Sequence, residues 1–60
     1  MHVFDYNKIY NEVCNTLDDP DCYYIDAIVS YIRDRYYEID SVDDIDSDEY
    51  WNIVLDHVKM

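Results

Sequence analysis

Apolar side chains recur every three or four positions near the start of the chain, which predicts an amphipathic helix from Tyr6 to about Leu17. The apolar face of this helix holds Tyr6, Ile9, Tyr10, Val13, Cys14 and Leu17, and the polar face holds Lys8, Asn11, Glu12 and Asn15. Asp5 precedes the helix as its N-cap, because a carboxylate there accepts an unpaired backbone N–H and suits the positive end of the helix dipole. Phe4 and Ile9 stand at the positions of a hydrophobic staple.

A proline within an acidic run ends the first helix and begins a second one, with Asp19 as N-cap and Pro20 at the first helical position. The second helix is predicted from Pro20 to about Ile39. Its core-facing arc contains Ile25, Ile28, Val29, Ile32, Tyr36 and Ile39, and its opposite arc contains Tyr23, Asp26, Ala27, Ser30, Asp34, Tyr37 and Glu38, with Tyr31 on the flank. The outer arc is unlike an ordinary solvated surface, on which the two signs of charge are mixed.

An acidic stretch follows the second helix, with seven acids among the twelve residues 38–49. Ile39, Val42 and Ile45 interrupt the acids. Ser41 is predicted to cap a short helical turn within this stretch, because its hydroxyl can accept a backbone N–H two residues on. The stretch therefore has folded structure of its own.

A third helix is predicted from Ser47 to Val58, where Asp46 as N-cap and Glu49 resemble a capping box. Its apolar residues are Tyr50, Trp51, Val54, Leu55 and Val58, with Ile53 on the far side. This apolar stripe is wider than one small bundle needs, so Ile53 is a candidate for a contact between two copies in a homodimer.

The chain contains no glycine and a single proline, so hairpins built on glycine turns have no support. Three amphipathic helices with short connections predict an all-α fold, a small three-helix bundle that residues 1–60 form as a single acidic helical domain. The tyrosine, valine and isoleucine content leaves one alternative, a strand near Val3 or after Ile39. A domain of this size buries only roughly 60% of the surface of its unfolded chain, so its stability is small.

Charge changes the picture most: fifteen Asp and Glu residues oppose four Lys and Arg residues, and the net charge is −11. Eight tyrosines, one tryptophan and one phenylalanine accompany the acids, whereas acidic disordered segments are poor in aromatic residues. The composition therefore predicts a folded acidic surface with a basic partner and argues against direct binding to nucleic acid, whose phosphates repel carboxylates. No apolar stretch approaches the roughly 20 residues that span a bilayer, so we expect no membrane association.

No motif predicts a cofactor, a metal or a catalytic site. The run Asp44–Asp48 begins like a calcium loop, but Glu49 stands where the loop needs glycine and Leu55 where it needs a bidentate glutamate. A zinc site would draw on His2, Cys14, Cys22 and His57, which lack the close pair spacing of zinc ligands. We therefore expect a protein that is not an enzyme.

The two cysteines, Cys14 and Cys22, follow an N-terminus without a basic, apolar leader, so we expect a cytoplasmic protein with reduced thiols. Each thiol is predicted to be a small buried side chain. A disulfide between them is the alternative.

The candidate interaction site consists of the outward acids and tyrosines of the second helix and of the acidic stretch after it. Its residues are Tyr23, Asp26, Tyr31, Asp34, Tyr37, Glu38, Asp40, Asp43, Asp44, Asp46, Asp48 and Glu49. Helix positions four apart lie roughly 6 Å apart along the axis, so Asp34 and Glu38 form a short ladder that can replace phosphates on a Lys and Arg array. The tyrosines are predicted as contact anchors. The alternatives are that the tyrosines cover neighbouring helices and that the acids form a solvated face.

In size, acidity, helical pattern and lack of catalytic motifs, the chain resembles small inhibitors encoded by bacteriophages and mobile elements. These are anti-restriction proteins, anti-CRISPR proteins and uracil-DNA glycosylase inhibitors, several of which act as DNA mimics. The resemblance is one of class and rests on no shared motif. It implies a stoichiometric inhibitor that blocks the basic nucleic-acid-binding site of a nuclease, a CRISPR effector or another DNA-processing enzyme in a bacterial host cell.

The alternative function is a non-enzymatic protein-interaction module, such as an antitoxin, an adaptor or a transcription regulator. Its binding surface would be the excess of apolar side chains around Trp51, Ile53 and Leu55. The two functions differ in what holds the partner, because one depends on charge and the other on apolar contact area.

Mutual repulsion among the acids predicts that the stability of the fold rises with ionic strength. Salt screens exposed charges beyond a Debye length of roughly 8 Å at physiological ionic strength, so the melting temperature should increase from a low-salt buffer to about 0.15 M salt. Thermal unfolding followed by circular dichroism measures this change. A melting temperature that stays constant or falls would contradict a clustered acidic surface.

Overall fold

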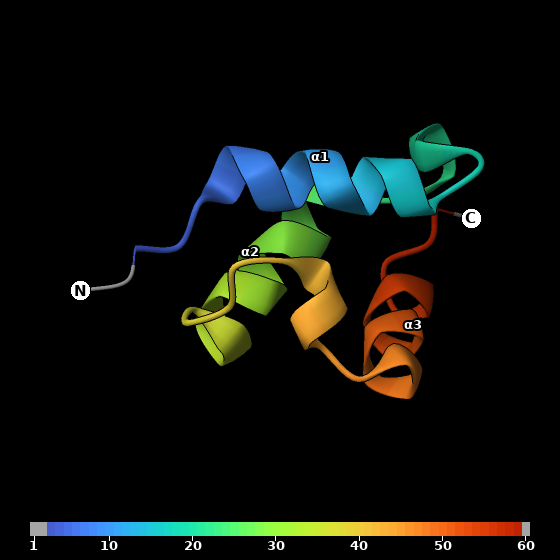
Figure 1. Ribbon diagram of the computed structural model, residues 1–60. Helices are drawn as coiled ribbons and strands as arrows, with labels where there is room; N and C mark the ends of the chain where they lie inside the picture. The colour runs from blue at the N-terminus through green and yellow to red at the C-terminus, as the bar shows by residue number, and fades with distance from the viewer. Residues whose placement is uncertain (1–2, 60) are drawn as a thin grey trace.

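Three α-helices enclose an apolar core within residues 3–59, the part of the chain that this computed structural model describes (Figure 1). The helices are α1 (Tyr6–Thr16), α2 (Ile25–Tyr36) and α3 (Ser47–Leu55), and short 3-10 turns at Pro20–Cys22 and Val42–Asp44 lie between them. α1 packs mainly on α2, and α3 packs on α2 as well. The prediction of a small all-α three-helix bundle is confirmed.

α1 begins and ends close to the residues that the sequence predicts. The Asp5 carboxylate accepts the backbone N–H of Lys8 at 3.1 Å, as expected for an N-cap. At the other end Leu17 is extended, with φ −110° and ψ 134°, and its N–H donates to the Cys14 carbonyl at 3.3 Å. Phe4 packs against the core, in agreement with its place in a hydrophobic staple.

The prediction of one helix from Pro20 to Ile39 is wrong at both ends. Pro20–Cys22 is a separate 3-10 turn, Tyr23 is extended, and α2 covers Ile25–Tyr36. Asp19 forms no side-chain cap on the turn; its carboxylate instead accepts the thiol of Cys22 at 3.2 Å.

A backbone pairing between the start of α2 and the end of the chain explains this break. Tyr23 and Val58 form an isolated antiparallel bridge. The flanking backbone hydrogen bonds run from Tyr24 N–H to the His57 carbonyl (2.9 Å) and from Lys59 N–H to the Cys22 carbonyl (2.7 Å). These bonds hold Tyr23 in an extended conformation and also end α3 at Leu55, short of the predicted Val58. Among residues 3–59 this bridge is the one β pairing, so the alternative of a strand near Val3 or after Ile39 is wrong.

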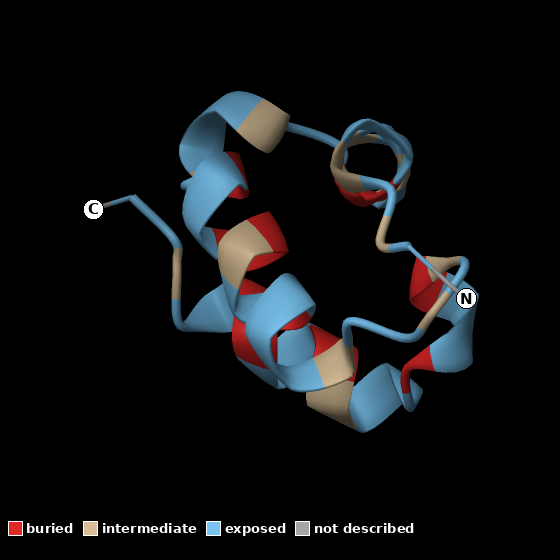
Figure 2. Cartoon of the chain, turned by 90° about the vertical axis from the view of Figure 1, so that its left-hand side faces the viewer, coloured by how far each residue is buried: buried red, intermediate tan, exposed pale blue. Residues whose placement is uncertain are grey.

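The core is formed by the inward faces of the helices and by two side chains of the segment between α2 and α3. Its buried apolar residues, among those that the structure describes, are Ile9, Val13, Leu17, Ile25, Ile28, Val29, Ile32, Val42, Ile45, Tyr50, Ile53 and Val54. Figure 2 shows the buried positions turned toward the middle of the molecule and the exposed positions turned outward. Burial of one valine or isoleucine contributes about 1.5–3 kcal/mol before the entropic cost of ordering the chain, so this core leaves a narrow margin of stability.

The assignment of Ile53 to a homodimer contact is wrong, because its side chain is only 4% exposed. α3 is rotated so that Tyr50, Ile53 and Val54, which share one helical face, pack into the core. As a result Trp51 and Leu55 are turned outward, 44% and 61% exposed. The sequence does not reveal this rotation, because the apolar stripe of α3 is wide enough for more than one face to be buried.

Glu12 has a structural function that the sequence does not predict. The sequence places it on the polar face of α1, yet it is half-buried. Its carboxylate accepts hydrogen bonds from the Ser41 hydroxyl at 3.2 Å and the Val42 N–H at 3.0 Å. Ser41 also caps the turn as predicted, because its oxygen accepts the Asp43 N–H at 3.2 Å. Glu12 thereby fastens the segment after α2 to α1, and Figure 1 shows the two running beside each other.

Replacing Glu12 by Ala is expected to lower the free energy of unfolding by about 1–3 kcal/mol, because the backbone N–H of Val42 loses a charged acceptor. The matched control is Glu38→Ala, which removes the same charge from an exposed position. Denaturant unfolding gives the stability, and amide hydrogen exchange gives the protection of the Val42 N–H. Equal stability of the two variants would show that the Glu12 hydrogen bonds do not stabilise the fold.

Candidate functional site

The acidic connection, which we define as residues 38–48, carries exposed carboxylates on a backbone that is fixed to the core. Val42 and Ile45 are only 7% and 6% exposed, so they hold the path of the chain between α2 and α3. The acids of this segment, all of them exposed, are Glu38, Asp40, Asp43, Asp44, Asp46 and Asp48. The structure therefore brings half of the predicted site residues onto one short, anchored segment.

Two predicted site acids also take part in the fold. The Asp44 carboxylate accepts the Asp40 N–H at 3.2 Å and closes the turn. Glu49 is half-buried beside Tyr36; partial burial, and then the hydrogen bond with Glu49, raise the pKa of the Tyr36 hydroxyl. The predicted capping box is wrong, because Asp46 makes no side-chain hydrogen bond to the helix.

The predicted ladder of Asp34 and Glu38 is wrong, because α2 ends at Tyr36 and Glu38 lies beyond the helix. Arginines also lie beside Asp34. Arg33 and Arg35 flank Asp34 in the sequence, and each guanidinium lies over a tyrosine ring. Arg33 is 5.9 Å from the ring centroid of Tyr6, and Arg35 is 5.5 Å from that of Tyr31. The outer face of α2 thus has mixed charge, and the concentrated acidity lies in the acidic connection.

The predicted tyrosine anchors differ in how far they are exposed. Tyr37 is 59% exposed and directly precedes the acidic connection. Tyr31 is 37% exposed, and its ring meets the edge of the His57 ring at a centroid distance of 6.0 Å, so it helps to hold the chain end on α2. Tyr23 is half-buried in the bridge to the chain end. Tyr24, which the sequence does not predict as a site residue, is 56% exposed. No local pattern signals it, because the break before α2 depends on the pairing of Tyr23 with Val58.

Two of the predicted residues lie far from the acidic connection. Tyr23 and Asp26 are at the start of α2, whereas the acidic connection follows its end, and twelve helical residues span roughly 18 Å. The Asp26 carboxylate accepts the Tyr6 hydroxyl at 3.2 Å, which orients it toward α1. The structure therefore divides the predicted site into two separate regions.

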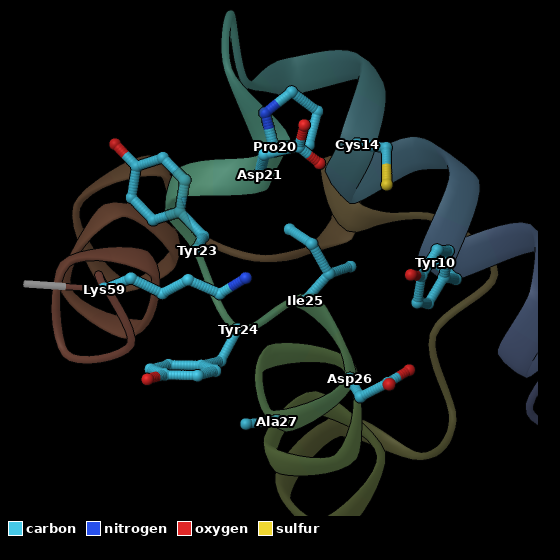
Figure 3. Close-up of a pocket in the computed structure, with 10 residues that line it drawn as sticks. All are labelled: Tyr10, Cys14, Pro20, Asp21, Tyr23, Tyr24, Ile25, Asp26, Ala27 and Lys59. Carbon is cyan, nitrogen blue, oxygen red and sulfur yellow. The ribbon is translucent and has the colours of Figure 1, made fainter.

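The second region is an open cavity of about 580 Å³, here called the tyrosine cleft, between α1, the first 3-10 turn and the start of α2 (Figure 3). Its aromatic and charged lining consists of Tyr10, Asp21, Tyr23, Tyr24, Asp26 and Lys59. The Lys59 ammonium lies 5.3 Å from the ring centroid of Tyr24. The sequence does not predict this cavity, because four separate segments form it.

α3 carries an exposed apolar pair. Trp51 and Leu55 are four positions apart, on one helical face, and both are exposed. The Trp51 ring meets the Tyr50 ring edge-on at a centroid distance of 5.2 Å, which fixes its orientation. Without Ile53, this pair is what remains of the predicted apolar binding face.

Both cysteines are free thiols, so the alternative of a disulfide is wrong for this structure. Cys14 is half-buried, but Cys22 is exposed, contrary to the prediction of a buried side chain. The hydrogen bond to Asp19 and the charge of that carboxylate raise the pKa of the Cys22 thiol. A raised pKa disfavours the thiolate, which is the nucleophilic form of cysteine.

Residues 3–59 contain no group of three His, Cys, Asp or Glu side chains that could hold a metal ion. His2, one member of the zinc set considered from the sequence, lies outside the described residues. No helix in the described part of the chain is both long enough and apolar enough to cross a membrane.

Comparisons with protein-family models, with curated proteins and with solved structures found no match to this chain. Exposed carboxylates on an anchored backbone, together with exposed tyrosines, are suited to binding a basic macromolecular surface.

Because the pKa values of three tyrosines are raised, the free energy of unfolding should fall at alkaline pH. Partial burial, and after it nearby acidic groups, raise the hydroxyl pKa values of Tyr10 and Tyr36, and burial raises that of Tyr50. Because tyrosine in an unfolded chain ionises near pH 10, the stabilisation is present in full below about pH 10 and is lost as pH rises through the higher pKa values of the folded state. Denaturant unfolding across this range, with tyrosinate absorbance in parallel, measures the effect. A constant stability above pH 10 would contradict it.

Proposed function

We propose that the protein is a stoichiometric inhibitor whose acidic connection occupies the basic nucleic-acid-binding site of a host defence or DNA-processing enzyme, such as a nuclease or a CRISPR effector. The observation that carries this proposal is the anchoring of the connection, whose exposed acids alternate with buried Val42 and Ile45. Glu12 adds hydrogen bonds to the same backbone. An anchored segment loses less conformational entropy on binding than a loose acidic tail, so more of the electrostatic attraction remains as affinity.

Electrostatics favours this class of partner. Enzymes that bind nucleic acid hold its phosphates with arrays of Lys and Arg, and this binding is largely electrostatic. Carboxylates compete for the same array, and a net charge of −11 accelerates the approach to a basic site. Three of the four Lys and Arg side chains lie over tyrosine rings outside the acidic connection, in the pairs Arg33–Tyr6, Arg35–Tyr31 and Lys59–Tyr24.

Tyr37 supports the same interface through contact area. It directly precedes Glu38 and is 59% exposed. A tyrosine ring covers the aliphatic stems of Lys and Arg, and its face attracts their charged ends. Inhibition then follows from occupancy alone, because the enzyme site that holds the acidic connection has no room for nucleic acid.

A second function, that of a protein-interaction module such as an antitoxin, adaptor or transcription regulator, is favoured by one observation. Trp51 and Leu55 expose 44% and 61% of their surface on one face of α3. Tryptophan is enriched among the side chains that dominate binding energy in protein interfaces. In this case the partner would be held by apolar contact, and salt would weaken the complex little.

Replacing Asp43 and Asp46 together by Lys is expected to abolish inhibition, because it reverses the charge at the centre of the acidic connection. Asp44 stays unchanged, since its carboxylate closes the turn. The matched control replaces Asp18 and Asp56 by Lys, which changes the net charge equally at exposed positions outside the connection. The target enzyme is first captured from a bacterial lysate on the immobilised protein, eluted by a salt gradient and identified.

The affinity of the identified enzyme for each variant is then measured by calorimetry, together with its binding to duplex nucleic acid. We expect competition between nucleic acid and the inhibitor, and an affinity that falls steeply with salt. Undiminished affinity at about 0.5 M salt, or equal losses in the two double variants, would overturn the proposal. Loss of binding in Leu55→Asp, with binding retained after the reversal of Asp43 and Asp46, would favour the interaction module.

A further inference from the structure

In the tyrosine cleft, the ammonium of Lys59 lies in a setting that would also suit a cation from a partner protein. The Lys59 ammonium lies 5.3 Å from the centroid of the Tyr24 ring, and Figure 3 shows the Lys59 side chain reaching into the cleft past that ring. Tyr10 and Tyr23 add two further aromatic rings to the lining, and Asp21 and Asp26 add two carboxylates. Aromatic faces combined with negative charge are the chemistry by which proteins recognise organic cations.

We propose that the tyrosine cleft receives one arginine or lysine side chain of the partner, and that Lys59 occupies this site in the free protein. The identity of the donor as a basic protein rests on the proposed function. Lys59 can be displaced, because it is exposed and its ammonium contacts the face of Tyr24, and such contacts are weak at exposed positions. Its backbone remains fixed, since the Lys59 N–H donates to the Cys22 carbonyl at 2.7 Å.

The size and the charge of the cleft agree with this ligand. Its volume of about 580 Å³ is within the range of roughly 300–1,000 Å³ that is typical of ligand sites. Asp21 and Asp26 outnumber the single ammonium of Lys59, so the lining keeps a formal charge of −1 with Lys59 in place and −2 once its ammonium leaves. The Tyr6 hydroxyl holds the Asp26 carboxylate in position by a hydrogen bond of 3.2 Å.

The opposite ligand, an anion, is disfavoured by the same residues. α2 begins at the cleft, and its N-cap residue Tyr24 supplies no side-chain hydrogen bond, so the positive end of this helix alone would attract an anion. Asp26, in the first turn, already supplies negative charge at that end, and Asp21 adds a second carboxylate to the lining. The two carboxylates therefore favour a cationic ligand over an anionic one.

The test titrates the full-length protein with Nα-acetyl-arginine amide while the ring resonances of its tyrosines are followed by NMR. Nα-acetyl-citrulline amide, which has the same shape without the charge, is the neutral control, and inorganic phosphate is the anionic one. We expect capped arginine to shift the resonances of Tyr10, Tyr23 and Tyr24 in a saturable manner. Capped citrulline and phosphate should leave them in place.

Three variants distinguish binding of capped arginine at a specific site from the general attraction of a cation to an acidic protein. Lys59→Met keeps the aliphatic stem and removes the competing ammonium, so it should bind capped arginine several-fold more tightly than the wild type does. Asp26→Asn should bind several-fold more weakly. Asp56→Asn, which changes the net charge equally at an exposed position outside both the tyrosine cleft and the acidic connection, should bind like the wild type.

Equal shifts with capped citrulline, saturable shifts with phosphate, or arginine-induced shifts spread over the whole surface would overturn the inference. Unchanged affinity in Lys59→Met or equal losses in the two Asp variants would do the same. If a variant fails to fold, the comparison of arginine with citrulline on the wild type decides alone. The test is independent of the target enzyme, so a negative titration leaves the acidic connection as the inhibitory surface, and a failure of the charge reversals at Asp43 and Asp46 leaves the titration unaffected.

Discussion

The pairing of the chain end with the start of α2 is the constraint on which the arrangement of the helices depends. Two backbone hydrogen bonds, one from Tyr24 to His57 and one from Lys59 to Cys22, close the chain into a loop that contains α2 and α3. The pairing sets where α2 begins and where α3 ends, and it brings Lys59 to the tyrosine cleft. In a domain with so small a core, a contact that joins distant segments compensates for burial that the chain is too short to provide.

Local structure in this chain follows from its sequence, whereas structure that depends on distant residues does not. The period of α1, its Asp5 cap and the Ser41 cap follow from neighbouring residues, and all three are present. The start of α2 depends on Val58, far along the chain, so no local pattern could reveal it. The rotation of α3 does not follow from its own sequence, because a short helix with apolar side chains around most of its circumference has no single preferred face. Packing against α2 buries Ile53.

The same distinction applies to the site. Exposure of the acids after α2 could be predicted, because Ile39, Val42 and Ile45 are the apolar positions among them. The function of Glu12 could not, since its partners Ser41 and Val42 lie about thirty residues away and its place on the helical wheel indicated solvent. The tyrosine cleft was also missed, because a cavity formed by four segments has no sequence signature.

In the acidic connection, one set of side chains fixes the backbone and another set carries exposed charge, and this separation has an evolutionary consequence. Its backbone is held by Val42, Ile45, Glu12 and the Asp44 carboxylate, whereas the side chains of Asp43, Asp46 and Asp48 are exposed. An electrostatic potential is a sum over charges, so it persists when an acid moves by one position or when Asp is exchanged for Glu. The surface can therefore drift in sequence while its field and its fold are retained. Two descendants of this protein could share an architecture and a charge, adapt to different basic partners, and have little sequence identity left in the segment that binds them.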